Sequence, residues 1–171
     1  YNYEEILGNF SLGDPIRVVD MNNPGISVQS EVGRQGSALA WVGMGLALEQ
    51  LGQSEDALLS FLHATEFLPE SEVLQFFLGR EYLFLSAQPT NRQNEYLQMA
   101  EETFKKSIIL NEGYVRSYIG LGSVYSRRAA SLIDTAIAMK QQADPQAELW
   151  VQESVDAYQT VLDLNPDSGE Y

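Results

Sequence analysis

Residues 41–69 read WVGMGLALEQLGQSEDALLSFLHATEFLP, and this stretch decides the fold class. Its apolar residues recur at spacings of three and four, which is the period of a helix with one buried face. Gly52 falls between the two periodic runs, and Pro69 ends the second one, since proline cannot continue a helix built before it. The pattern therefore predicts two amphipathic helices joined by a short turn.

The same pattern occurs three times along the chain. Gly45 and Gly79 are 34 residues apart, and Gly122 takes the same place in a third copy. We expect these glycines where the two helices of a unit approach most closely, with Ala57 and Ala100 as the matching small surface on the second helix. Large aromatic side chains are expected to fill the spaces between units: Trp41, Phe61, Tyr82, Phe104, Tyr118, Tyr125 and Tyr158.

This signature resembles the tetratricopeptide repeat, or TPR, whose units of 34 residues each form a pair of helices. The resemblance covers about residues 36–168, roughly four-fifths of the chain, and the first unit fills nearly every signature position. It implies an all-α fold, a right-handed α-solenoid (superhelix) of antiparallel helix pairs. An irregular N-terminal arm precedes the repeats.

The second and third units are longer than the first, by about 9 and about 20 residues, and both insertions fall at the turn between the helices. Asp144-Pro145 is typical of an N-cap followed by proline in the first turn of a helix. The larger insertion is therefore predicted to extend both helices of the third hairpin by about 10 residues, or roughly 15 Å. The expected organisation is a non-repeat arm at 1–35, unit 1 at 36–71, unit 2 at 72–114, unit 3 at 115–168, and the start of a possible further segment at 169–171.

Residues 1–35 lie outside the repeat pattern. Gly13 and Pro15 are among several residues that break any long helix there, while side chains such as Phe10 are too apolar for a solvated tail. We interpret this segment as an irregular arm that packs on the solenoid, with a disordered leader as the alternative. Because the chain opens at Tyr1 rather than at a methionine, we expect a piece of a longer protein.

The composition narrows the classes of function. The chain of 171 residues carries 10 Lys and Arg against 24 Asp and Glu, a formal net charge of −14. Such a surface repels phosphate backbones and anionic lipids, so we expect no nucleic-acid partner. No apolar run approaches the roughly 20 residues of a membrane-spanning helix, so we also expect no membrane insertion.

Residues that could carry catalysis or hold a cofactor are scarce. There is no cysteine, and His63 has no second histidine with which to share a metal ion. Glu101 and Glu102 are neighbours on a predicted helix and point apart, so we interpret them as solvated surface. The glycine pairs at 43–45 and 120–122 lie inside predicted helices, which favours helix contact over a phosphate-binding loop. We therefore predict no enzyme activity, no cofactor and no metal site.

In TPR proteins the first helix of each unit lines an inner groove that receives a partner peptide. By that resemblance, the partner groove of this chain is expected to consist of Leu39, Val42, Leu46, Phe76, Phe77, Arg80, Phe84, Arg116, Ile119, Ser123 and Arg127. The three phenylalanines could instead be ordinary core. The three arginines predict a local positive lining that holds a carboxylate, since arginine is rarely buried without a partner.

One binding mode of the family is not expected here. Chaperone-binding TPRs grip a C-terminal carboxylate with a lysine and asparagines from their first and second units and two basic residues from their third. The corresponding positions of this chain hold Val42, Leu46, Phe77, Arg116 and Gly120. Only Arg116 fits, so the sequence argues against an Hsp90/Hsp70 carboxylate clamp.

We hypothesise a non-enzymatic scaffold or adaptor that binds a protein partner, as a peptide or helix, in this groove. Two alternatives stay open: a self-associating module whose groove is filled by its own arm, and a regulatory segment of a larger enzyme. Apolar residues on the last helix, including Trp150, Val155 and Leu162, predict a further helix or a homodimer through this helix or the extended hairpin. The sequence does not distinguish a bacterial cytoplasm from export.

Overall fold

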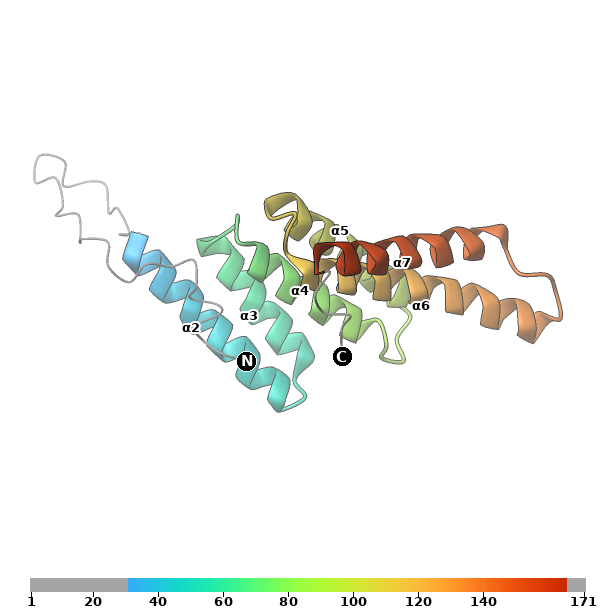
Figure 1. Cartoon of the computed structure of the whole chain (residues 1–171). Coiled ribbons are helices and arrows are strands. Elements are labelled where there is room, and N and C mark those ends of the chain that lie inside the picture. Colours follow the sequence, from blue (N-terminus) through green and yellow to red (C-terminus); the bar gives the residue numbers. More distant parts are fainter. Residues whose placement is uncertain (1–30, 166–171) are drawn as a thin grey trace, which may run out of the picture.

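The computed structural model describes residues 31–165, which form six α-helices (Figure 1). The helices are α2 (Glu31–Gln50), α3 (Ser54–Phe67), α4 (Glu72–Leu85), α5 (Gln93–Leu110), α6 (Val115–Met139) and α7 (Pro145–Leu164). The arm predicted for residues 1–30 lies outside the described residues, as do residues 166–171. Residues 31–35 were also expected to belong to the arm, but they form the start of α2. A single glycine such as Gly33 costs a helix only about 1 kcal/mol, which the rest of α2 outweighs.

The helices pair as three antiparallel hairpins, α2–α3, α4–α5 and α6–α7, and each hairpin packs on the next. Helix α4 also contacts α6, whereas α5 and α7 make no extensive contact with each other. The first helices of the hairpins therefore lie along the inner side of the stack, and the second helices lie along its outer side. This arrangement confirms the all-α superhelix of antiparallel helix pairs (Figure 1).

Each hairpin closes where a glycine of its first helix meets an aromatic ring of its second. A Cβ atom on the glycine would lie 2.6, 2.7 and 2.9 Å from the ring in the three pairs, Gly45 with Phe61, Gly79 with Phe104, and Gly122 with Tyr158. The predicted close approach at the glycines is confirmed. Phe61 and Phe104 also contact the next hairpin, as expected of rings that fill the spaces between units, whereas the ring of Tyr158 contacts α6 of its own hairpin.

The core continues from one hairpin to the next through aromatic stacking. The ring of Phe61 in α3 lies parallel to that of Phe77 in α4, with 5.2 Å between ring centroids and 8° between ring planes. Phe104 in α5 is fully buried and packs in turn against α4 and α6. Burial of each such side chain is worth about 2–3 kcal/mol, so these rings hold successive hairpins together.

The third hairpin is the longest, as predicted. Helix α6 has 25 residues and α7 has 20, compared with 14 in α3 and in α4. The tip of this hairpin projects beyond the other two hairpins (Figure 1). Asp144 is the N-cap of α7 and its Oδ1 accepts a hydrogen bond of 2.9 Å from the backbone N–H of Gln146, with Pro145 at the first helical position. The predicted cap and proline start are confirmed.

Small side chains allow α6 and α7 to approach closely along this hairpin. Ala129 and Ala136 of α6 are buried, as are Ala147 and Ala157 of α7. The hydroxyl of Ser154 donates a 2.9 Å hydrogen bond to the backbone carbonyl of Gly122 on the facing helix. Despite its length, neither this hairpin nor any other described helix combines the length and apolar character that a membrane span requires.

Candidate partner-binding surface

All eleven residues of the predicted groove lie on α2, α4 and α6, the inner helices of the stack. Their exposure differs widely. Phe84 on α4 is 51% exposed and Ile119 on α6 is 44% exposed. Seven of the others are partly exposed: Leu39, Leu46, Phe76, Arg80, Arg116, Ser123 and Arg127. The accessible apolar surface on the inner side is therefore centred on α4 and α6.

Two predicted groove residues are core residues instead. Val42 and Phe77 are each only 2% exposed, so neither offers surface to a partner. Val42 lies in the cluster of buried side chains that runs through all three hairpins, and Phe77 is stacked on Phe61. Each inner helix has one face that the next hairpin covers and another that lines the groove. The spacing of the residues alone did not distinguish these two faces.

Phe76 is partly buried because it completes an aromatic cluster. Its ring centroid lies 5.8 Å from that of Phe77, 6.1 Å from that of Phe104 and 5.7 Å from that of Tyr114. The contact with Tyr114 is edge-to-face, which is a favoured geometry for aromatic pairs. Phe76 thus supports the junction between α4, α5 and the start of α6 while part of its surface remains accessible.

Arg80 is already paired within the protein. Its Nη2 forms an ion pair and a hydrogen bond with Glu49 Oε1 at the end of α2, and the same nitrogen lies 3.7 Å from Glu81 Oε1. Its guanidinium also lies over the ring of Phe77, 4.8 Å from the ring centroid. The sequence reasoning missed Glu49, although its position one turn after Leu46 places it on the same inner face of α2. Arg80 is therefore a link between α2 and α4 as well as a surface cation.

Glu81 is the most deeply placed acid near this surface. It is 4% exposed, and its Oε2 atom has no hydrogen-bond partner among the described residues. Burial raises the pKa of Glu81 above the ordinary value of a glutamate, and the nearby charge of Arg80 offsets only part of that effect. Ionisation of the Glu81 carboxyl group therefore costs free energy in the folded protein, even with Arg80 nearby.

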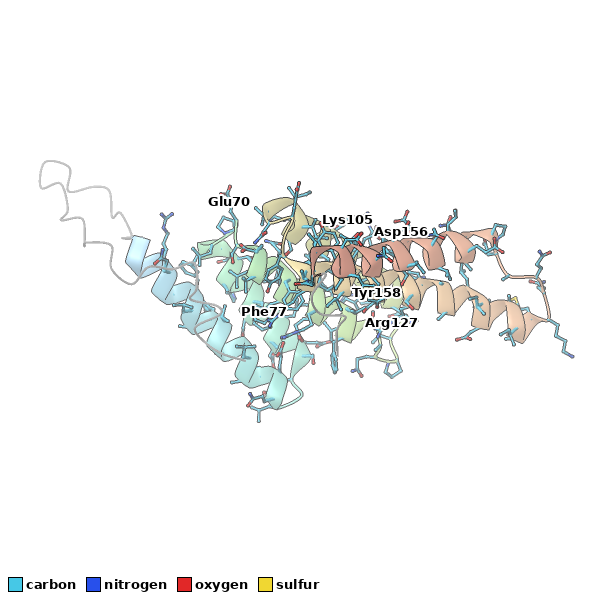
Figure 2. The ribbon with its side chains drawn as sticks, viewed as in Figure 1. Glu70, Phe77, Lys105, Arg127, Asp156 and Tyr158 are labelled. Carbon is cyan, nitrogen blue, oxygen red and sulfur yellow. The ribbon has the colours of Figure 1, made fainter. Side chains whose placement is uncertain are left out.

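The guanidinium of Arg127 also forms hydrogen bonds within the protein. Its Nη1 donates a 2.5 Å hydrogen bond to the backbone carbonyl of Leu83 and a 2.7 Å hydrogen bond to Ser86 Oγ. Both acceptors lie at the C-terminal end of α4, where backbone carbonyls lack helical partners and a cation is favourable. The expectation of three arginines that simply line the groove is therefore corrected for Arg80 and Arg127, which tie neighbouring hairpins together. Figure 2 shows the position of Arg127 on the side of α6 that faces α4.

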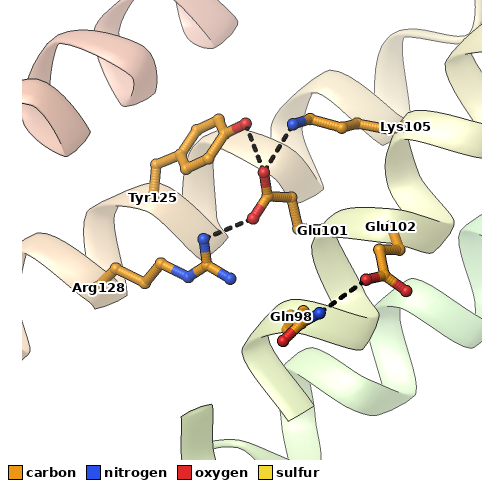
Figure 3. A network of polar contacts seen from close by, with 6 residues as sticks. All are labelled: Gln98, Glu101, Glu102, Lys105, Tyr125 and Arg128. Carbon is orange, nitrogen blue, oxygen red and sulfur yellow. Dashed lines mark hydrogen bonds and ion pairs between the residues drawn. The ribbon is translucent and has the colours of Figure 1, made fainter. Parts of the chain in front are cut away.

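A polar network on the outer side of the stack joins α5 to α6 (Figure 3). Glu101 accepts hydrogen bonds from Lys105 at 2.6 Å, from Tyr125 at 3.1 Å and from Arg128 at 2.5 Å. Arg128 also lies over the ring of Trp150 on α7, 5.4 Å from its centroid. The interpretation of Glu101 as solvated surface is wrong, because its side chain is only 17% exposed and is held from three sides. Glu102, in contrast, is exposed.

The charges around Glu101 determine its protonation. Burial by itself would raise the pKa of Glu101, but the hydrogen bond from Lys105 and the charge of Arg128 outweigh it, and the pKa lies below the ordinary value. The same pairing raises the pKa of Lys105. Glu101 and Lys105 are therefore both charged near neutral pH, and the network acts as a structural bridge between α5 and α6.

His63, the single histidine of the sequence, lies on α3. His63 is exposed, its ring centroid lies 4.5 Å from that of Trp41, and its Nδ1 lies 3.4 Å from Glu66. Within this range no three acidic or histidine side chains converge to hold a metal ion. A hollow beside α2, lined in part by Leu39, Val73 and Leu74, has a cavity volume of about 10 Å³, which is room for one water molecule at most.

Solved TPR domains have the same architecture. The first TPR of Spaghetti (RPAP3) bound to HSP90 peptide SRMEEVD is 18% identical in sequence, with a TM-score of 0.56 over 78% of this chain and 82% of that chain. The second TPR of Spaghetti (RPAP3), bound to the same peptide, is 15% identical, with a TM-score of 0.56 over 79% and 97%. The NMR structure of the first TPR domain of the human RPAP3 protein is 18% identical, with a TM-score of 0.55 over 78% and 82%.

No model of a protein family matches the sequence, and no curated protein matches it. The similarity of this chain to TPR domains therefore rests on its three-dimensional structure. Six helices packed as three antiparallel hairpins, with a small residue under an aromatic ring in each, define a TPR domain fold. The TPR fold predicted from the repeat signature is confirmed.

Proposed function

We propose that this chain is a non-enzymatic protein–protein interaction module, a scaffold or adaptor, that binds a peptide or helix on the inner surface of its superhelix. The observation that carries this proposal is the exposure of Phe84 and Ile119 on adjacent inner helices. Large apolar side chains exposed beside charged groups are typical of interaction surfaces. The RPAP3 TPR domains, which share the fold, were solved with a bound peptide.

The chemistry of this surface suits a ligand with apolar anchors beside an acidic group. Phe84 and Ile119 provide the apolar contacts, with part of Phe76 between the same helices. Arg80 and Arg116 lie on the same two helices, α4 and α6. A guanidinium has five N–H donors, so Arg80 can keep its bond to Glu49 and still donate to a carboxylate of the ligand.

The ligand is not proposed to be the HSP90 peptide held by a carboxylate clamp. Such a clamp needs polar side chains at positions where this chain has Val42, Phe77 and Gly120, and all three are buried. The resemblance to peptide-bound RPAP3 domains thus supports the use of the inner surface, and the residues present argue for a different peptide.

A peptide-display selection followed by titration tests the proposal. Peptides selected on the purified chain are titrated by fluorescence anisotropy against the Phe84→Ala and Ile119→Ala variants. Each variant is expected to bind at least about tenfold more weakly, as truncation of an interface anchor does. Ile109→Ala is the matched control, because Ile109 is 79% exposed on α5, on the outer side of the stack. Selected peptides that bind all three variants equally would place the binding surface elsewhere.

A further inference from the structure

One face of α7 is apolar and largely exposed. Its members are Val151, Val155, Tyr158 and Leu162, spaced four, three and four residues apart, so they form one continuous stripe along the helix. Their exposed fractions are 45%, 53%, 38% and 55%. We call this stripe the α7 face. It borders α6, where Ser123 Oγ lies 3.1 Å from the hydroxyl of Tyr158.

The repeat itself shows what normally covers such a face. With Gly79 matched to Gly122 and Ala100 to Ser154, the α7 face corresponds to Leu97, Glu101, Phe104 and Ile108 of α5. Helix α6 covers that stripe: Gly120 of α6 lies against the ring of Phe104, and Tyr125 and Arg128 bond to Glu101. In the first hairpin, Phe61 of the corresponding α3 stripe is stacked against Phe77 of α4. In both earlier hairpins the occupant is therefore a helix.

The charges of α7 indicate the charge that a helix bound to the α7 face should carry. Four of its residues are acidic, none is basic, and the acids are Glu148, Glu153, Asp156 and Asp163. Gln152 and Gln159 flank the stripe, and their side-chain amides donate to Asp156 at 2.7 Å and to Asp163 at 2.9 Å, which fixes those two carboxylates along the helix. Figure 2 shows Asp156 and Tyr158 on different sides of α7.

Two nearby cations are directed away from these acids. The arginines of α6 closest along the chain are directed to the other hairpins, Arg127 to Leu83 and Ser86 of α4, and Arg128 to Glu101 of α5. At 100° per residue, Glu148 borders the α7 face and Asp163 lies just beyond the row of Gln152 and Gln159, so both are within reach of basic side chains of a partner. A long lysine or arginine side chain can lie along the stripe and reach carboxylates one helical row away.

Charge also argues against two occupants from this protein itself. A second copy would bring another α7, with four acids and no base, against the first. Residues 1–30 contain Glu4, Glu5, Asp14 and Asp20 with Arg17 as their one basic residue, so the N-terminal segment is acidic too. Like charges held face to face disfavour both contacts.

We propose that the α7 face is a second binding surface, and that it binds an amphipathic helix of a partner protein with an apolar stripe flanked by Lys and Arg. The partner helix lies along α7 as α6 lies along α5. This surface is separate from the inner surface proposed above, and it selects basic rather than acidic ligands. A failure of either proposal therefore leaves the other standing.

Two synthetic helices test the charge selectivity. The first has 18 residues with leucine at positions i, i+3, i+4 and i+7 of each repeat and lysine beside them, and the second has glutamate in place of every lysine. Fluorescence anisotropy with the full chain is expected to show binding of the lysine helix, at least tenfold weaker binding of the glutamate helix, and weaker binding of the lysine helix at high salt.

Because an acidic protein attracts any basic peptide, variants must locate the contact. The Val151→Ser, Val155→Ser, Leu162→Ser triple variant is expected to bind the lysine helix at least tenfold more weakly. Its matched control replaces three apolar residues exposed elsewhere, Leu51, Leu59 and Ile109, with serine and is expected to bind like the unmodified chain. The Glu148→Gln, Asp156→Asn, Asp163→Asn variant should bind more weakly and with a smaller salt dependence. Neutralisation of Glu55, Asp56 and Glu66 on α3 is its control.

Several results would overturn the proposal. Equal loss of binding in the two serine variants, or in the two charge-neutralised variants, would show general electrostatic attraction rather than a site. Self-association that the serine triple variant abolishes would identify a second copy as the occupant. Binding that requires prior removal of residues 1–30 would identify the N-terminal segment as the occupant. Circular dichroism of each variant checks that the helices are retained.

Discussion

Gly120 of α6 lies directly against the ring of Phe104 of α5. A Cβ atom on Gly120 would fall 2.4 Å from both Cε1 and Cζ of that ring. The same ring covers Gly79 of α4, where a Cβ would come within 2.7 Å. One fully buried phenylalanine thus fixes the distances among three helices, and two glycines provide the room it needs.

Replacement of Gly120 by alanine is expected to destabilise the chain. The new methyl group forces Phe104 or a helix backbone to move, which costs about 1–3 kcal/mol and outweighs the better helix propensity of alanine. Urea unfolding followed by circular dichroism measures the change. Gly36→Ala on α2 is the control, because nothing lies within 4 Å of its Cβ position, and it should stabilise by about 0.5–1 kcal/mol. Equal midpoints for the two variants would contradict the close packing at Gly120.

Glu101→Gln is expected to weaken the fold in a pH-dependent way. The folded pKa of Glu101 is lower than its unfolded pKa, so its stabilisation is complete above the unfolded pKa and is lost as the pH falls through the folded pKa. The variant should be less stable by about 1–3 kcal/mol at pH 7, and the difference should shrink in acid. Glu102→Gln, a neighbouring exposed residue, is the control. A pH-independent difference would show that the charge of Glu101 is not the cause.

The substitution Glu81→Met is expected to stabilise the chain, in contrast to Glu101→Gln. The folded pKa of Glu81 is raised, so ionisation penalises the folded state increasingly as the pH rises from the unfolded pKa through the folded pKa. Methionine has a similar volume and no charge, and it should stabilise the chain by about 1–2 kcal/mol at pH 7. The gain should diminish in acid, where Glu81 is protonated. Unfolding midpoints measured from pH 4 to pH 8 test this, and a variant less stable than the natural chain throughout would refute it.

Asp144→Ala should loosen the tip of the third hairpin. Removal of an N-cap carboxylate costs about 1 kcal/mol, and it leaves the Gln146 N–H without its acceptor at the start of α7. Amide hydrogen exchange is expected to speed up in the first turns of α7 and to stay unchanged in α4 and α5. Asp134→Ala, an exposed site within α6, should not show this local effect.

The repeat pattern predicted the fold because its strongest constraints are local. Gly45 and Pro69 mark a close approach and a helix end, and neither depends on distant parts of the chain. Asp144-Pro145 likewise identifies the start of α7 from two residues. Residues 31–35 were misassigned because the cost of one glycine in a helix is small, so Gly33 is a weak signal for a boundary.

The inner surface was harder to predict because exposure depends on contacts between hairpins. Val42 and Phe84 both belong to inner helices, but the next hairpin buries the first and leaves the second open. The partners of Arg80 and Arg127 lie 31 and 41–44 residues away in sequence, beyond any spacing rule. Helical periodicity identifies which face of a helix is apolar, and only the stacked structure shows what covers it.

In the third hairpin, the residues that stack on the second hairpin differ from those that determine how far the hairpin projects. Gly122 contacts Tyr158 and Ser154 at its base, and bonds to the other hairpins continue along α6 as far as Arg127 and Arg128. From Arg128 to Met139 the helix spans about 16 Å at 1.5 Å per residue. Insertion or removal of matched pairs of turns would change that distance without a change in the superhelix. The length of this hairpin therefore determines how far its tip lies from the inner surface.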